Sequence, residues 1–153
     1  MFEPCAADKQ TYQPNKNSSV NGDQHMAYFK FIGRIIGKAV YDGRLLDAYF
    51  NRAFYKQILG RTVDMRDLES IDPEYHKSLQ WMLDNDITGV IDQEFTIEDE
   101  QFGEKKIVEL KPGGADIPVT EENKEEYVRL VVSYRLDNSI KDQIKAFLDG
   151  FYE

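Results

Sequence analysis

The sequence has very few residues that could carry covalent or metal chemistry. Its 153 residues include one cysteine, Cys5, and two histidines, His25 and His76. One cysteine cannot form an internal disulfide, so a reducing, intracellular setting is the default expectation. One cysteine and two histidines also give no recognised zinc-ligand spacing. A nucleophilic cysteine needs a positioned base, and no histidine is near Cys5 in the sequence. A cysteine enzyme built on Cys5 is therefore the weakest hypothesis that we keep.

The sequence also lacks the features of membrane, nucleic-acid and nucleotide-binding proteins. No apolar run approaches the roughly 18 residues of a membrane span, and nothing resembles a signal peptide. The net charge is −9 and the isoelectric point lies near 4.8, whereas nucleic acids and anionic membranes attract basic proteins. No P-loop, dinucleotide-binding or EF-hand pattern occurs. We therefore expect no metal, no cofactor, no nucleic-acid partner and no membrane span, although the acidity would suit a basic protein partner.

The longest apolar pattern in the sequence predicts a buried helix over about residues 23–40. Apolar residues recur there at spacings of three and four, and Asp23 is a plausible N-cap. Gly33 and Gly37 are four residues apart and so lie on one face of this helix. Each of them lowers helix stability by about 1 kcal/mol relative to alanine. We therefore expect a neighbouring helix, rather than a ligand, to pass close to these two glycines.

Shorter patterns precede and follow this helix. Residues 1–22 are polar and contain several loop-forming residues, so they predict an irregular segment. Apolar residues at i+4 steps predict a second helix over 45–59, with Gly60 ending it. The acidic residues 64–72 predict a single helical turn.

The helix predicted over residues 73–85 has apolar residues on two sides. Tyr75, Leu79 and Met82 fall on one side, and Trp81 lies about 200° around the axis from Leu79. The core explains one apolar face, and the second needs another partner. Either the helix is buried on both sides between two subdomains, or it presents an exposed docking face, and periodicity alone favours neither.

The second half of the chain mixes strand and helix patterns. Residues 94–98 and 106–110 are predicted strands, and the turn between them predicts a hairpin with Phe102 exposed at its tip. Thr120 is expected to cap the next helix. A final helix carries a one-sided apolar stripe over 140–151. These patterns predict an α+β fold that is mostly α-helical.

Several strings of this sequence, in this order, resemble one family. They include YFKFIGRIIGKAVYDGRLLDAYF from Tyr28, DLESIDPEYHKSLQWMLDNDI from Asp67, VTEENKEEYV from Val119 and IKAFLDGFYE from Ile144. Together with FYKQILGR and FGE..IVELKPGG, they closely resemble the N-terminal lobe of HECT-type ubiquitin ligases, of the Nedd4/Rsp5 and Tom1-like types. The resemblance covers nearly the whole chain from Tyr28 onward.

The resemblance implies a function in ubiquitin transfer. HECT ligases accept ubiquitin from a ubiquitin-conjugating enzyme as a thioester on a cysteine, and they pass it to a lysine of a protein substrate. That cysteine belongs to a C-terminal lobe and lies in a Thr-Cys-Phe-like context, which does not occur here. Cys5 matches a different part of the pattern. The resemblance therefore implies transferase activity for a full-length protein, whereas this stretch, without the C-lobe, is expected to be inactive alone.

The resemblance also implies two binding sites. The groove for the conjugating enzyme lies in a small subdomain, and its matching positions here are Tyr75, Leu79, Asn85, Tyr127 and Val131. Because Tyr75 and Leu79 share one face of their helix, we expect that face to be the docking face.

The second implied site is a non-covalent ubiquitin exosite. Phe102 and Arg135 match two of its positions, and Pro4 stands where relatives have a tyrosine. A non-enzymatic ubiquitin-binding or scaffold module that uses Phe102 and Arg135 is therefore the alternative function.

The expected architecture follows from the same resemblance. Residues 64–120 would form the small subdomain that binds the conjugating enzyme, and the remainder would form a larger, helical subdomain. Protein substrates would be bound through other regions of a longer chain. The expected location is the cytoplasm, and a nuclear location is the alternative.

Overall fold

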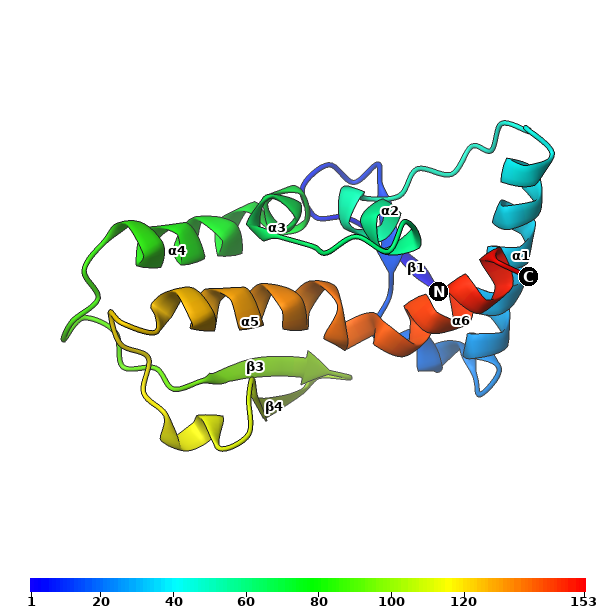
Figure 1. Ribbon diagram of the computed structural model, residues 1–153. Helices are drawn as coiled ribbons and strands as arrows, with labels where there is room; N and C mark the ends of the chain where they lie inside the picture. The colour runs from blue at the N-terminus through cyan, green and yellow to red at the C-terminus, as the bar shows by residue number, and fades with distance from the viewer.

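Two separate apolar cores lie in opposite halves of an elongated molecule (Figure 1). The computed structural model describes all residues from Met1 to Glu153 and confirms the mostly helical α+β class. No helix combines the length and the apolar character that crossing a membrane requires. In chain order the elements are β1 Phe2–Pro4, β2 Tyr12–Pro14, η1 Ser18–Asn21, α1 His25–Tyr41, α2 Arg52–Ile58, α3 Met65–Ile71, α4 Pro73–Asp84, β3 Thr96–Gln101, β4 Glu104–Glu109, η2 Gly114–Asp116, α5 Lys124–Leu136, η3 Asn138–Ile140 and α6 Lys141–Phe151.

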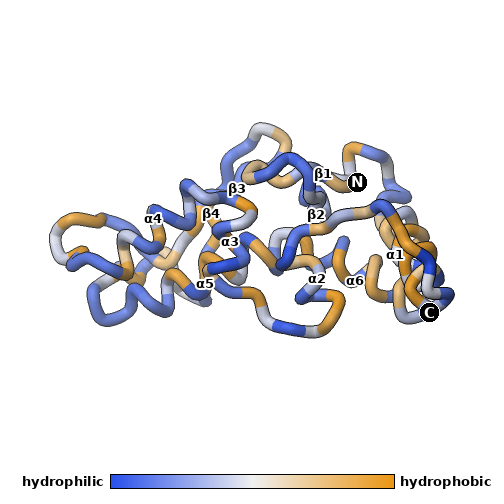
Figure 2. Tube along the Cα trace, turned by 90° about the horizontal axis from the view of Figure 1, so that it is seen from above, coloured by the Kyte–Doolittle hydropathy of each residue, from blue (hydrophilic) through white to orange (hydrophobic).

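The two cores divide the chain into two units. We call residues 63–136 the hairpin unit, because α3, α4 and α5 pack there against the β3–β4 hairpin around twelve buried residues. We call residues 1–60 together with 138–153 the body, whose core consists of Phe29, Phe54, Ile58, Ile144 and Phe147. The two clusters share no residue, and hydrophobic stretches occur in both halves of the trace (Figure 2). The boundary at about 64–120 for a partner-binding subdomain stays a prediction.

The helices α1 and α6 cross at a contact lined by glycines. A Cβ added at Gly33 would lie against the carbonyl oxygen of Phe147, closer than the 3.0 Å that real Cβ atoms respect. A Cβ at Gly37 would meet Phe151 in the same way, and one at Gly150 would meet the backbone of α1. The expectation that a helix passes close to Gly33 and Gly37 is therefore confirmed. The helix begins at His25 with Gln24 as N-cap, rather than with Asp23.

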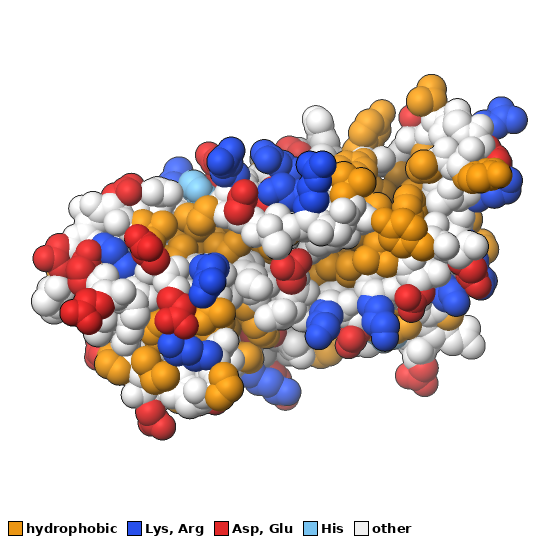
Figure 3. Space-filling view, viewed as in Figure 1, with side chains coloured by type: hydrophobic (Ala, Val, Ile, Leu, Met, Phe, Trp, Pro, Cys, Tyr) orange, Lys and Arg blue, Asp and Glu red, His pale blue; other side chains and the backbone are white.

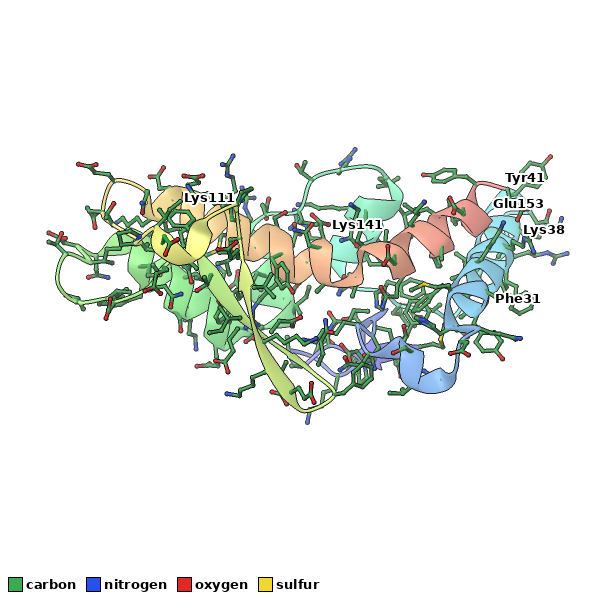
Figure 4. All side chains as sticks on the ribbon, turned by 90° about the horizontal axis from the view of Figure 1, so that it is seen from below. Phe31, Lys38, Tyr41, Lys111, Lys141 and Glu153 are labelled. Carbon is green, nitrogen blue, oxygen red and sulfur yellow. The ribbon has the colours of Figure 1, made fainter.

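The outer face of α1 is exposed, so the expectation of a buried helix is wrong for that face. Only Phe29 and Gly33 are buried, because the one long helix that packs along α1 is α6. Figure 4 shows Phe31, Lys38 and Tyr41 pointing away from α6. The exposed apolar side chains of α1 are Tyr28, Phe31, Ile35, Val40 and Tyr41.

Residues 44–50 form no helix, so the helix expected over 45–59 is wrong in its first half. The helix α2 begins only after Asn51, whose side chain accepts a hydrogen bond from the Phe54 N–H at 2.8 Å. The Asn51 N–H donates to the carbonyl of Tyr12, which holds the preceding segment beside β2. An asparagine side chain that caps the first N–H groups of a helix favours a helix start at that residue. This local signal at Asn51 decided where α2 begins, although the apolar spacing suggested an earlier start. Gly60 ends α2 with a φ of +66°, as expected.

The N-terminal segment is more ordered than the expected loop. Residues Phe2–Pro4 pair antiparallel with Tyr12–Pro14. Phe2 anchors this hairpin, because its ring centroid lies 5.3 Å from those of both Phe29 and Phe50. This segment is polar and shows no apolar periodicity, but packing of one aromatic ring into a cluster of others holds it in place.

The elements of the hairpin unit begin and end at local signals. The helix α4 starts at Pro73, and the Asp72 side chain accepts from the Tyr75 N–H, as predicted. The strands β3 and β4 pair antiparallel and meet at a turn in which Phe102 and Gly103 have φ values of +54° and +80°. Positive φ at both central residues is the signature of a type I′ hairpin turn.

The helix α5 begins later than expected. Its first residue is Lys124, so Thr120 is not its N-cap. Instead, the Asn123 side chain accepts a hydrogen bond from the Thr120 N–H at 2.7 Å. The Glu121 carboxylate forms an ion pair with Lys124 and accepts from the Ile87 N–H, so it lies in the turn before the helix.

A buried carboxylate connects α2 and α3 at the joint between the two units. Asp67 is fully buried, and its Oδ2 accepts from Lys56 Nζ at 2.7 Å and from the Asp64 N–H at 2.8 Å. Its Oδ1 lies 3.3 Å from Arg52 Nε without hydrogen-bond geometry. The Asp64 side chain completes a capping box by accepting from the Asp67 N–H.

We expect Asp67→Asn to lower the free energy of unfolding by about 2 kcal/mol, because it removes the buried partner of Lys56 and leaves the ammonium only its longer contact with the half-exposed Asp64. Chemical denaturation measures this difference. Glu74→Gln is the control, because its pair with Lys77 is exposed and should leave the free energy of unfolding unchanged. An equal effect of the two substitutions would contradict the role of Asp67.

Candidate functional site

The structure places four of the five proposed groove residues together in the core of the hairpin unit. Leu79, Tyr127 and Val131 are 3%, 6% and 0% exposed, and Tyr75 packs against the same cluster. Asn85 is exposed at the C-terminal end of α4. Of this set, Tyr75 and Asn85 offer surface to a partner, and the three buried side chains support that surface from below.

Tyr75 is held in one orientation by Arg135. The guanidinium carbon of Arg135 lies 3.7 Å from the centroid of the Tyr75 ring. Arg135 Nη1 also lies 3.4 Å from Asp72 Oδ2, and Asp72 caps the helix that carries Tyr75. Burial raises the pKa of the Tyr75 phenol, although the nearby Arg135 acts in the opposite direction. The aromatic ring is therefore a half-buried, pre-oriented contact element.

Tyr127 is a core residue. Its ring meets Phe95 edge-on at a centroid distance of 5.6 Å. Burial raises the pKa of its phenol to about 12. Tyr127 therefore fixes α5 against the hairpin, and a partner could reach it only after displacing its neighbours.

Trp81 is exposed on the side of α4 opposite Leu79, and the assignment of the docking face to Tyr75 and Leu79 stays a prediction. Leu79 packs in the core, whereas Trp81 is 47% exposed. The helix is therefore not buried on both sides. The Asn85 side chain donates to the carbonyl of Trp81 at 2.9 Å, which joins these two positions into one exposed surface. In the sequence, the position of Trp81 about 200° around the helix axis from Leu79 had indicated a second apolar side.

The two proposed exosite residues have different environments. Phe102 is 61% exposed at the hairpin tip, as expected, and a non-glycine residue with positive φ is uncommon there. Arg135 is instead engaged by Tyr75 and Asp72. Arg135 and the exposed Pro4 line one cavity, and Phe102 is not part of its lining.

That cavity lies between the hairpin unit and the body and has a volume of about 720 Å³. Its polar lining comes from both units and includes Lys16, Asn51, Gln57, Asp99, Tyr134 and Arg135. A second, apolar groove of about 490 Å³ lies on the body and is lined by α1 and residues 46–50. Figure 3 shows hydrophobic side chains gathered over the body between α2 and α1.

The chain's only cysteine lies inside the fold. Cys5 is fully buried, and its Sγ accepts from Asn51 Nδ2 at 3.5 Å. Neither histidine contacts it: His25 Nδ1 is hydrogen-bonded to Ser18 Oγ, and His76 lies on α4. No group of three or more histidine, cysteine, aspartate or glutamate side chains is placed to hold a metal ion.

Comparisons with known proteins give one consistent result. A family model described as HECT-domain (ubiquitin-transferase) matches residues 1–153. An E3 ubiquitin-protein ligase TOM1-like protein of Neurospora crassa is 59% identical over 153 residues, which are 100% of this chain and 4% of that protein. The E3 ubiquitin-protein ligase ptr1 of Schizosaccharomyces pombe is 57% identical over 151 residues, 99% of this chain and 5% of that protein. The E3 ubiquitin-protein ligase RSP5 of Emericella nidulans is 49% identical over 153 residues, 100% of this chain and 18% of that protein. The chain thus spans a small part of the length of these relatives.

Proposed function

Because the chain belongs to the HECT-domain family of ubiquitin transferases, we propose that it docks a ubiquitin-conjugating enzyme as part of a HECT ubiquitin-protein ligase. In this function, ubiquitin passes from the docked enzyme to a cysteine of the ligase and then to a lysine of a protein substrate. The match of the family model to all of residues 1–153 carries the proposal. The relatives named as E3 ubiquitin-protein ligases support it.

The docking surface that we propose lies on α4 and the loop that follows it. Tyr75 supplies an aromatic ring that Arg135 already orients, and Asn85 lies exposed at the other end of the helix. We add Trp81, because it exposes a large apolar side chain beside Asn85. Aromatic side chains held in one orientation are typical anchors of protein interfaces. Leu79, Tyr127 and Val131 would keep this surface in place from the core.

The chain's own role in this function is binding. A Thr-Cys-Phe-like string does not occur among these 153 residues, and Cys5 is buried without a base. We therefore propose that the thioester-forming cysteine belongs to another part of the ligase and that these residues alone do not transfer ubiquitin. Substrates would be bound through other regions, in the cytoplasm or the nucleus.

A ubiquitin-binding role at the hairpin tip is the second candidate function. Phe102 carries it, because this residue exposes an aromatic side chain from a turn that imposes an uncommon positive φ. Unusual backbone conformations of this kind cluster at functional positions.

We expect Phe102→Ala to abolish the chemical-shift changes that free ubiquitin causes around the turn in an NMR titration of the ¹⁵N-labelled chain. The substitution keeps a Cβ, so it does not alter the preference of the turn backbone. Ile107→Ala on the same hairpin is the matched control, because Ile107 is 78% exposed and should leave the titration unchanged. If Phe102→Ala responds to ubiquitin as the unsubstituted chain does, the tip is not a ubiquitin site.

A further inference from the structure

The hairpin unit and the body are connected mainly along one side. The chain crosses between them twice, after α2 and at η3 between α5 and α6. Three side chains of α2 reinforce this side: Arg52 and Lys56 pair with Asp67, and Gln57 Nε2 donates to the Leu136 carbonyl at 2.8 Å. The two crossovers and these bonds lie on the same side of the boundary, and no other stretch of the chain connects the units. Such an arrangement can act as a hinge.

A single ion pair joins the units elsewhere. Lys16 Nζ lies 2.5 Å from Asp99 Oδ1, between residues 83 positions apart in the sequence. The other side-chain hydrogen bonds and ion pairs between the units come from α2, apart from the bond that Ser139 Oγ donates to the Arg135 carbonyl at the crossover between α5 and α6. Both Lys16 and Asp99 line the 720 Å³ cavity that separates the units. Figure 4 shows the hairpin reaching toward the N-terminal segment that carries Lys16.

Each end of this ion pair is anchored in its own unit. The Lys16 carbonyl accepts a hydrogen bond from Gln143 Nε2 at 3.2 Å, which fixes the segment to α6. On the other side, Tyr134 Oη and Gln101 Nε2 donate to Asp99 Oδ2 at 2.9 and 3.0 Å. The ion pair therefore connects α6 of the body to β3 and α5 of the hairpin unit.

The ion pair is also shielded from water more than the other pairs on the hairpin. The Asp99 side chain is 7% exposed and that of Lys16 is 30% exposed, whereas the Lys105–Glu98 pair is 68% and 56% exposed. Burial alone would raise the pKa of Asp99, but the bonds from Lys16, Tyr134 and Gln101 outweigh it and hold that pKa below its usual value. Removing one partner of a shielded pair leaves a costly unpaired charge, whereas breaking an exposed pair costs little.

We propose that Lys16 and Asp99 form a latch that holds the hairpin unit closed against the body, so that breaking the pair lets the two units rotate about the α2 side. The latch would set the orientation of the unit that carries α4 relative to the body. Its existence does not depend on which protein α4 binds. Opening would widen the cavity and expose its lining, including Tyr134 and Arg135.

The test measures the distance between the units. Spin labels are attached through Ser19→Cys in the body and Glu104→Cys at the hairpin tip, both exposed positions, in a Cys5→Ser background. Pulsed electron paramagnetic resonance should give one narrow distance distribution for this parent. Lys16→Met and Asp99→Asn should each broaden the distribution and shift it to longer distances. The double substitution should add nothing further, because either change alone removes the same contact.

Lys105→Met is the matched control, because it removes an exposed ion pair from the same hairpin and should leave the distribution unchanged. Circular dichroism of each variant verifies that the helices persist. A Lys16→Met distribution that coincides with that of the parent would overturn the latch. An equal broadening by Lys105→Met would also overturn it, because the effect would then be local to the hairpin. Neither result would bear on the docking of a conjugating enzyme at α4.

Discussion

Gly33→Ala is expected to lower the free energy of unfolding by about 3 kcal/mol, although alanine is the better helix former. In an exposed helix the same substitution would stabilise by about 1 kcal/mol. At Gly33 the new methyl group would collide with the Phe147 carbonyl oxygen of α6, which is backbone and cannot rotate away. The two helices would have to separate, and the aromatic core beneath the crossing would lose contacts. Urea denaturation measures the difference in the free energy of unfolding.

Whether Gly33→Ala raises or lowers the free energy of unfolding distinguishes a glycine at a close helix crossing from a glycine on an exposed helix face. Ala27→Gly on the exposed side of the same helix is the matched control, and it should destabilise by about 1 kcal/mol through propensity alone. A stabilising Gly33→Ala substitution would show that α1 and α6 do not approach as closely as the structure has them.

Tyr75→Ala is expected to weaken the binding of a ubiquitin-conjugating enzyme at least about tenfold, which corresponds to about 1.4 kcal/mol. The reason is that Arg135 and the Asp72 cap already orient the ring, so binding need not immobilise it. Trp81→Ala is expected to act in the same direction through the loss of exposed apolar surface. Isothermal titration calorimetry against a panel of ubiquitin-conjugating enzymes measures the affinity.

Two choices keep this binding experiment interpretable. Leu79→Asp is avoided, because a carboxylate at a position that is 3% exposed would unfold the core whatever its effect on a partner. Tyr41→Ala is the control, because Tyr41 is 87% exposed on α1 of the body and should leave the affinity unchanged. If Tyr75→Ala and Trp81→Ala both bind as tightly as the unsubstituted chain, the docking surface is not on α4.

The sequence predicted the elements whose signals are local. Pro73 and its Asp72 cap start α4, and the paired glycines of α1 indicated a helix crossing. The exposed Phe102 followed from its place between two strands. At Pro73 and Phe102 the backbone conformation depends on the residue itself or on its near neighbours. The glycine pair indicated that a helix passes close to α1, but not which helix.

The features that the sequence did not predict depend on contacts between distant residues. The segment before Asn51 is not helical, and its end is hydrogen-bonded to Tyr12 of β2, which was itself expected to be loop. The pairing of Lys16 with Asp99 joins residues 83 positions apart and leaves no periodic signal. Periodicity also could not decide which apolar side of α4 faces the core, because both sides carry large apolar residues. Packing of α4 against α5 buried Leu79 and left Trp81 exposed.

The most direct test of the central claim is an NMR titration of the ¹⁵N-labelled chain with unlabelled ubiquitin-conjugating enzymes. We predict that at least one enzyme shifts or broadens the amide signals of residues 73–91 and of α5, and leaves those on the outer face of α1 unchanged. The absence of any change across the panel, or changes confined to α1 and α6, would contradict the proposal that this chain docks the conjugating enzyme through α4.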